Sequence, residues 1–217
     1  MSAVMTYDSL VEDMISYSER ATDAAFTAQV PKFIALAELD LAANWRGLGN
    51  QKLVTDAFTI DQPIVAKPAM WRETIAWNFG TGTGNATRNY LLERSLEYCR
   101  IYWPDPTVSD SASPPLYYAN YDWDHFLVAP TPAVAYPFEL GYYERITPLD
   151  DANQTNWLTE HAPMFLLSAC MLQAQLYLKW FGDRLQAWQA MYANQAQSLG
   201  LEARNQTVDR STVVDKQ

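Results

Sequence analysis

The chain has 217 residues, of which 49% are hydrophobic and 13% aromatic, so it can bury a sizeable core of its own. It carries 25 acidic and 15 basic residues. This excess of acids argues against a nucleic-acid-binding protein, which would bind phosphates through clustered Lys and Arg. Residues 157–217 hold five acids and five bases, so the whole acidic excess lies in residues 1–156.

Two helices are predicted in the N-terminal part of the chain. Thr6 or Asp8 can cap the first, whose apolar residues follow helical spacing over 10–17. Pro31 suits the first turn of the second helix, which is expected to end at the glycines of 47–49.

The following part is predicted to contain strands. Segments 53–60 and 71–79 are rich in strand-forming residues, and the glycine-rich segment 80–85 is typical of a hairpin tip. Segments 116–128 and 136–145 are predicted to pair as antiparallel strands, joined around the prolines between them.

A short helix interrupts this β region. Ser95 can cap a helical stretch over 96–102, and Pro104 stops it. The polar, proline-bearing segment 105–115 that follows is predicted to be a loop.

The C-terminal part is predicted to form a helical hairpin. A strongly apolar helix spans 157–181, Gly182 breaks it, and Asp183 can cap the next helix. We expect Leu176 and Trp188 to be buried between the two helices. The second helix presents one stripe of residues at three- and four-residue steps, namely Leu185, Trp188, Tyr192, Gln195 and Leu199.

Helices, then strands, then helices indicate an α+β fold. We expect a helical bundle, made of the N-terminal helices and the long C-terminal helical hairpin, with an antiparallel β region inserted in the middle. Residues 1–200 are expected to form a single domain, helical over 5–49 and 157–200 and β-rich over 50–146. Residues 201–217 lose apolar residues and are expected to form an extended C-terminal tail.

Neither the cysteines nor the apolar stretches point to a metal site or a membrane. Cys99 and Cys170 lack metal-ligand spacing and are expected to be small buried thiols. Met1–Leu10 has no basic start and no apolar core, so no signal peptide is expected. The longest apolar stretch, 162–181, contains polar Ser, Gln and Lys residues that favour a buried helix over a membrane span.

The glycine-rich segment 80–85 was weighed as a phosphate-binding loop. Such a loop needs glycines before a helix N-terminus and usually a following Lys. Here no Lys follows and the third-glycine spacing is wrong, so a hairpin tip is the better interpretation.

Asp122, Asp124 and His125 were weighed as an acid/base or metal site. On a strand the two carboxylates would share one face while His125 would point to the other, which works against a three-ligand site. The other histidine, His161, falls on a predicted helix. Solvent-facing acids beside a half-buried aromatic strand are the plainer interpretation.

Aromatic segments were weighed as a carbohydrate groove. Trp45–Gly47 and Tyr142–Glu144 offer aromatic faces that could stack on sugars, but core and interface packing explains them more simply. The sequence shows no Ser with a matching His and Asp pattern. We therefore assign no catalytic, cofactor-binding or metal-binding residue, expect no cofactor, and predict that the protein is not an enzyme.

The order of motifs along residues 5–200 resembles the head-to-tail adaptor, or connector, proteins of tailed bacteriophages, especially short-tailed ones. The most specific piece is the Asn-x-Thr-Asn-Trp-Leu stretch that leads into the apolar helix. The segments that carry the resemblance are Phe33–Leu39, Leu92–Pro104, Asp124–Pro130, Phe138–Tyr143 and Pro148–Leu158.

This resemblance implies a structural virion protein at the head–tail junction, assembled in the host cytoplasm. Members form a ring, expected to be a dodecamer, beneath the portal protein. The C-terminal tail reaches into the portal, the lower face receives the tail tube or nozzle, and tail fibres are a further partner that the resemblance allows. DNA passes through the lumen at ejection without specific binding, and we expect part of the acidic excess to line that lumen. No membrane partner is implied.

Two other functions compete with this one. The first is a carbohydrate- or ligand-binding β module of the tail or fibre class, which would show an exposed Trp in a groove. The second is a hydrolase that uses the region of Asp122, Asp124 and His125.

Overall fold

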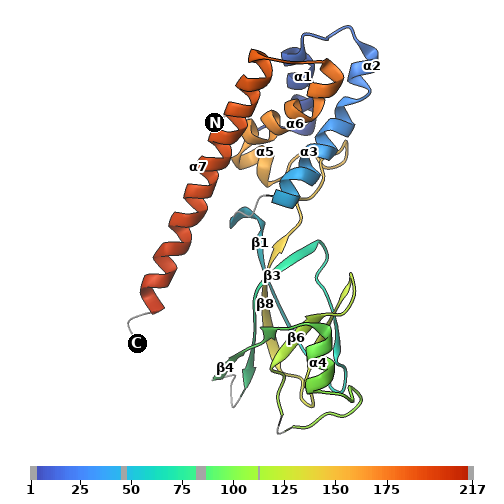
Figure 1. The fold of residues 1–217 in the computed structure, drawn as a ribbon, viewed down its shortest axis with the longest axis vertical. Coiled ribbons are helices and arrows are strands. Elements are labelled where there is room, and N and C mark those ends of the chain that lie inside the picture. Colours follow the sequence, from blue (N-terminus) through green and yellow to red (C-terminus); the bar gives the residue numbers. More distant parts are fainter. Residues whose placement is uncertain (1–3, 45–47, 82–86, 112, 215–217) are drawn as a thin grey trace. The chain divides into compact units, whose positions relative to one another are not determined.

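The computed structural model describes residues 4–44, 48–81, 87–111 and 113–214 (Figure 1). Contacts divide the chain into two compact units, residues 1–50 with 146–217 and residues 51–145. Helices build the first, the helical unit, and strands with one helix build the second, the β unit. The predicted α+β class is therefore confirmed, and the β region is inserted between two helical stretches as expected. Whether both units behave as a single domain stays a prediction.

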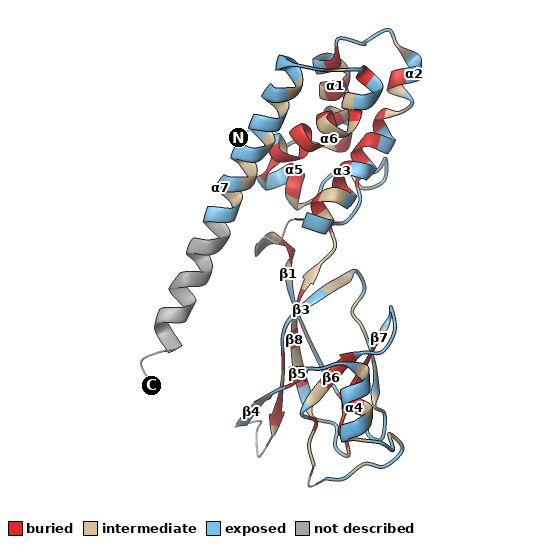
Figure 2. Ribbon diagram, viewed as in Figure 1, coloured by how far each residue is buried: buried red, intermediate tan, exposed pale blue. Residues whose placement is uncertain are grey.

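In the helical unit, α6 lies at the centre of the other helices. It contacts α1, α3, α5 and α7, and buried residues occupy all sides of its first half, as expected for a helix that is apolar all round, whereas Leu176 near its end stays exposed. Figure 2 shows this burial along the helix. The helices are α1 (Tyr7–Ser18), α2 (Ala24–Thr27), α3 (Val30–Asn44), α5 (Trp157–His161), α6 (Pro163–Leu178) and α7 (Asp183–Val214), with a 3-10 turn at Leu48–Asn50.

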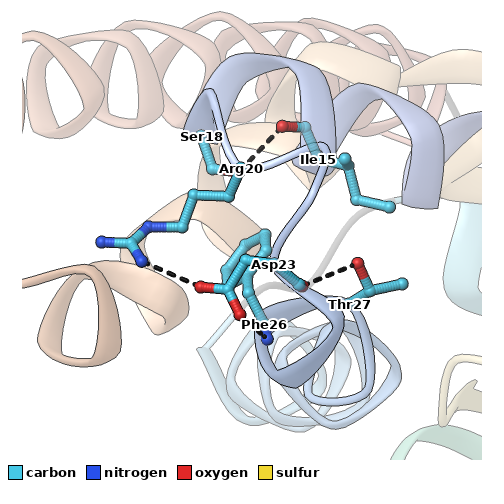
Figure 3. Close-up of polar contacts among 6 residues, drawn as sticks. All are labelled: Ile15, Ser18, Arg20, Asp23, Phe26 and Thr27. Carbon is cyan, nitrogen blue, oxygen red and sulfur yellow. Dashed lines mark hydrogen bonds and ion pairs between the residues drawn. The ribbon is translucent and has the colours of Figure 1, made fainter.

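The connection between α1 and α3 is held by one aspartate (Figure 3). Asp23 caps α2 by accepting the backbone N–H of Phe26 at 3.0 Å, and its other oxygen accepts from Arg20 at 2.9 Å. The Thr27 hydroxyl donates to the Asp23 carbonyl at 3.1 Å. The Phe26 N–H first, and Arg20 second, hold the pKa of Asp23 below its ordinary value. The capped turn directs Phe26 into the core of the helical unit.

The structure confirms the predicted start of α3 and shows which of the two candidate residues caps α1. Thr6, and not Asp8, caps α1: its hydroxyl accepts the backbone N–H of Ser9 at 3.2 Å, and Ser9 Oγ accepts the N–H of Thr6 at 2.8 Å. Pro31 lies in the first turn of α3, as predicted.

The C-terminal helical hairpin forms, but the prediction of one helix over 157–181 is wrong. Ala162 leaves the helical conformation before Pro163, so the chain forms α5 and then α6, which ends at Leu178. The second helix of the hairpin is longer than predicted. Lys179 and Gly182 adopt positive φ angles of 55° and 72° between α6 and α7. Helix α7 then runs to Val214, so the prediction of an extended tail is wrong for residues 201–214. The physical reason is local: this segment contains no proline and no glycine, so no residue in it interrupts the helix that begins at Asp183.

Strands in the β unit form two four-stranded sheets. Their orders are β1-β8-β3-β4 and β2-β7-β6-β5, and the β5–β6 pair is parallel while the others are antiparallel. The elements are β1 (Gln51–Ala57), β2 (Ile64–Ala66), β3 (Trp71–Thr81), β4 (Thr87–Tyr90), β5 (Leu92–Glu93), α4 (Leu96–Tyr102), β6 (Tyr117–Asn120), β7 (His125–Ala129) and β8 (Pro137–Glu144).

An aromatic core joins the two sheets into a sandwich. The Trp77 ring lies 5.3 Å from Tyr118, 5.0 Å from Phe126 and 5.4 Å from Phe138, centroid to centroid. Helix α4, capped by Ser95 as predicted, covers the outer face of the second sheet. There Cys99 packs with Ala119, Leu127 and Ala129.

The predicted pairing of segments 116–128 and 136–145 is wrong. The first folds on itself as the β6–β7 hairpin, whereas β8 pairs with β1 and β3 in the other sheet. Strand β7 is covered on both faces, by the sandwich core and by α4, so four of its five residues are buried. Such a central strand takes a neighbour on each side, and its neighbours are β2 and β6.

Candidate interaction surfaces

The candidate acid/base residues, Asp122, Asp124 and His125, lie at the tip of the β6–β7 hairpin. Asp122 accepts the backbone N–H of Asp124 at 2.7 Å, and His125 Nδ1 lies 2.9 and 3.0 Å from the two Asp122 oxygens. The predicted strand geometry, with His125 on the face opposite Asp122, is therefore wrong. Because the segment turns here, the imidazole and the carboxylate meet and close the turn.

The pKa of Asp122 is lowered by the hydrogen bonds that stabilise this turn. Desolvation raises the pKa of Asp122, but hydrogen bonds from Asp124 and His125, with the charge of His125, bring it below its ordinary value. Across the described parts of the chain, no three His, Cys, Asp or Glu side chains gather as metal ligands. His161 belongs to the helical unit, where its ring stacks on Trp157 at 5.2 Å.

The structure describes only part of the glycine-rich segment 80–85 and none of the aromatic segment 45–47. Gly80 and Thr81 end β3 and pair with Arg88 and Thr87 of β4, which agrees with a hairpin, while residues 82–86 lie outside the described residues. Trp45–Gly47 also lies outside them.

The segment Tyr142–Glu144 forms no shared groove. Tyr142 faces the sandwich core and is 7% exposed, whereas Glu144 lies 3.7 Å from Lys52 on the neighbouring strand. The plainer interpretation, core packing, fits Tyr142.

A buried carboxyl group was not among the candidate residues predicted from the sequence. Glu38 on α3 is 5% exposed, and its two oxygens each lie 3.2 Å from the backbone N of Leu149. Its Oε1 also accepts from Asn156 Nδ2 at 2.9 Å. Asn156 caps α5, so one carboxyl ties α3 to the segment that leads into α5 and α6. The sequence signal was its position on the buried stripe, four residues after Ile34 and three before Leu41.

Burial perturbs the titration of this group. Desolvation raises the pKa of Glu38 to about 7, partly opposed by the hydrogen bonds from Leu149 and Asn156, while the charge of Asp150 adds to the increase. The protonated form is therefore favoured in the folded protein below neutral pH.

Large apolar side chains remain exposed on the helical unit. Leu176 is 80% exposed, Phe181 77% and Leu39 67%. The expected burial of Leu176 is wrong, because it lies on the side of α6 that neither α3 nor α7 covers. Trp188 is partly buried as expected and meets Tyr17 edge-on at 5.6 Å. These exposed side chains are candidates for contact with other proteins where they form a continuous apolar patch.

Leu176 and Trp188 form a matched pair for a stability test. Trp188→Asp is expected to lower the free energy of unfolding by about 3 kcal/mol or more, because it puts a charge against the helical core. Leu176→Asp is expected to change it by less than about 0.5 kcal/mol, since the residue is exposed. Urea unfolding followed by circular dichroism measures both; equal losses would contradict the described packing of α7 on α6.

The β unit leaves one side of its sandwich open. Edge strands β1 and β2 flank a cleft of about 390 Å³, whose lining combines apolar residues such as Val54 and Leu140 with polar ones such as Asp56 and Lys67. Leu53 on β1 is 67% exposed and Tyr90 on β4 is 63% exposed. Free strand edges beside apolar surface are sites where proteins associate.

Both cysteines are free and buried, as expected. Desolvation raises the pKa of the Cys99 and Cys170 thiols. Among the described helices, none combines the length and the apolar character that crossing a bilayer demands.

Comparison with known proteins gives one family. The family model described as SU10 adaptor protein matches residues 5–215. No curated protein matches the chain. The match includes both units, the inserted β unit and the whole described length of α7.

Proposed function

Because this chain belongs to the SU10 adaptor protein family, a family of phage head-to-tail adaptors, we propose that it forms the ring that joins the portal to the tail. The observation that carries this proposal is the family match over residues 5–215. The match spans residues of both units and is not confined to a single motif.

The distribution of apolar surface supports a ring subunit. A ring subunit needs two lateral faces that differ, because head-to-tail contacts close the circle. Exposed apolar residues occur on the helical unit, at Leu39, Leu176 and Phe181, and on the β unit, at Leu53 and Ile101. Copies of the chain would cover part of this surface, while the portal and the tail tube or nozzle would cover the rest.

We infer finer features of the assembly from the same family membership. The ring is a dodecamer at the head–tail junction of the virion, it assembles in the host cytoplasm, and tail fibres are a further possible neighbour. DNA passes through its lumen, and part of the acidic excess in residues 1–156 lines that lumen, because negative walls do not hold DNA back. Electrostatic mapping of the assembled ring tests this; a lumen dominated by Lys and Arg would reject it.

Helix α7 supports a role in portal docking. Its first part packs on the helical core through Trp188, Tyr192, Ala196 and Leu199. The helix then continues to Val214, past the last residue in that stripe. We propose that its last turns, with residues 215–217, bind the portal.

Removing residues 201–217 is expected to leave the helical unit folded but to reduce portal binding at least tenfold, which corresponds to about 1.4 kcal/mol. The stripe of α7 residues that packs on the core remains intact in this variant. Co-sedimentation with purified portal rings measures the loss, and circular dichroism checks the fold. The full-length chain, loaded under the same conditions, is the control. Normal loading of the shorter chain onto portals would show that another surface docks.

We infer that the protein acts without catalysis. Asp122, Asp124 and His125, the residues weighed for hydrolysis, bond one another to close a turn. An Asp124→Asn variant that abolished a measured hydrolytic activity while retaining the fold would contradict this inference.

A further inference from the structure

An open hollow of about 420 Å³ lies beside the tip of the β6–β7 hairpin. Its lining comes from separate segments of the β unit: Lys67 after β2, Trp71 of β3, Asn120 and Trp123 at the hairpin, and Arg145 after β8. A volume of this size suits a small ligand.

Trp123 provides a flat, fixed wall of this hollow. Although it is among the largest side chains, 72% of it is exposed. The Arg145 guanidinium lies 4.6 Å from the centroid of its ring, and the Arg145 backbone N–H donates to the Met70 carbonyl at 2.7 Å. The cation–π contact therefore holds the indole in one orientation, with its remaining surface open to a ligand.

A second indole and a second cation also line the hollow. Lys67 Nζ lies 4.3 Å from the centroid of Trp71 and 5.0 Å from that of Phe126, and it donates to the Asp122 carbonyl at 2.7 Å. The ammonium has three donors, of which this bond uses one.

Both hydrogen-bond donors and hydrogen-bond acceptors line the hollow. Lys67 and Arg145 supply N–H donors, and within the described residues neither forms an ion pair. Asp122 is a lining residue of the same hollow, with its carboxylate bonded to Asp124 N and His125, and Asp124 lines the adjoining hollow toward Met70. Asn120 donates through Nδ2 to Glu93 at 3.1 Å, and its Oδ1 is an additional acceptor.

The mixed charges around the hollow disfavour several classes of ligand. An anion would meet Asp122 and Asp124, a cation would meet Lys67 and Arg145, and an apolar group would desolvate these charges without replacing their hydrogen bonds. A neutral ring with many hydroxyl groups satisfies both kinds of polar group, because each hydroxyl donates and accepts. The C–H face of such a ring can pack on an exposed indole.

We propose that the hollow formed by Lys67, Trp71, Asn120, Trp123 and Arg145 is a saccharide-binding site that takes one neutral pyranose ring against Trp123. It is an activity in addition to the adaptor role and stands on different residues from those proposed to dock the portal. A single ring with these few hydrogen bonds is expected to bind weakly, with a Kd of about 1 mM, which corresponds to about −4 kcal/mol.

Saturation-transfer NMR on the full chain tests the proposal with methyl glucoside, galactoside, mannoside and N-acetylglucosaminide as probes. At least one pyranoside is expected to bind, with its C–H face receiving most of the saturation. Trp123→Ala and Arg145→Ala are expected to weaken that binding at least tenfold, whereas Trp123→Tyr retains most of it. Tyr90→Ala removes another exposed aromatic side chain of the β unit and serves as the matched control.

Absence of binding by every pyranoside at about 50 mM, far above the expected Kd, would overturn the proposal and leave the hollow as a contact for a protein segment. Binding that survives in both Trp123→Ala and Arg145→Ala would also overturn it, because the sugar would then bind elsewhere. Portal loading by Trp123→Ala separates the two functions. If this variant loads normally but does not bind sugar, the adaptor proposal stands independently of the sugar site. If the parent chain binds sugar but does not load onto portals, the saccharide proposal stands and the adaptor proposal fails.

Discussion

Replacing Trp77 with alanine is expected to lower the free energy of unfolding of the β unit by about 3–5 kcal/mol, the range for deleting a buried large aromatic side chain. Trp77 is 1% exposed and contacts Phe58, Tyr118, Phe126 and Phe138, so its ring touches side chains from both sheets. Its removal leaves a cavity that neither sheet can fill without moving. Urea unfolding monitored by circular dichroism measures the effect.

Two further variants define what Trp77 contributes. Trp77→Phe is expected to cost much less than Trp77→Ala, because the indole N–H is buried without a hydrogen-bond partner in the described part of the chain. Tyr90→Ala removes an exposed aromatic group and should change stability by less than about 0.5 kcal/mol. If Trp77→Ala were as mild as Tyr90→Ala, the sandwich core would be misassigned.

Glu38 is expected to make stability depend on pH in the direction opposite to an ordinary ion-paired carboxylate. The folded-state pKa of Glu38 is about 7 against 4.5 in the unfolded chain, so the folded protein binds more protons between these values. Its contribution to stability is therefore greatest at low pH and decreases by about 3 kcal/mol as pH rises from 4.5 through 7.

Substitution at this position separates charge from hydrogen bonding. Glu38→Gln keeps an acceptor but cannot ionise, so it should gain stability relative to the parent chain as pH rises through the same range. Glu38→Ala leaves the Leu149 N–H and the Asn156 amide without this partner and should lose about 2–3 kcal/mol at pH 5. Urea unfolding of the three proteins at pH 5 and pH 8 measures both effects. A difference between Glu38→Gln and the parent that is the same at both pH values would contradict the proposed titration.

Local signals predicted several helix boundaries, although they missed the division of 157–178 into α5 and α6 and the full length of α7. Ser95 caps α4, Thr6 caps α1, and Gly182 lies in the break between α6 and α7, because each acts through its own backbone or side-chain geometry. The same holds for the α+β layout, which follows from the order of periodic segments.

Strand partners could not be predicted in the same way. Strand β7 is buried on both faces, so it lacks the alternation of apolar and polar residues that indicates a side facing the core. Its pairing with β2 and β6 depends on contacts far apart in the sequence, which no local pattern reveals. The prediction therefore joined it to β8, which belongs to the other sheet.

The candidate sites show the same limit. The sequence drew attention to Asp122, Asp124 and His125, but it could not show that they close a turn beside an exposed Trp123. A Trp in an aromatic, strand-like segment is expected to be buried, and only the hairpin geometry places this one in solvent. The buried position of Glu38 was visible as an acid on an apolar helical stripe, whereas its partners Leu149 and Asn156 were not.

Electron microscopy of purified portal rings mixed with the full chain tests the adaptor role most directly. We expect a second ring on the tail-facing end of the portal, with one copy of the chain for each portal subunit and with residues 201–217 at the contact. Portal rings that stay bare at saturating protein, while the chain remains a folded monomer, would contradict it.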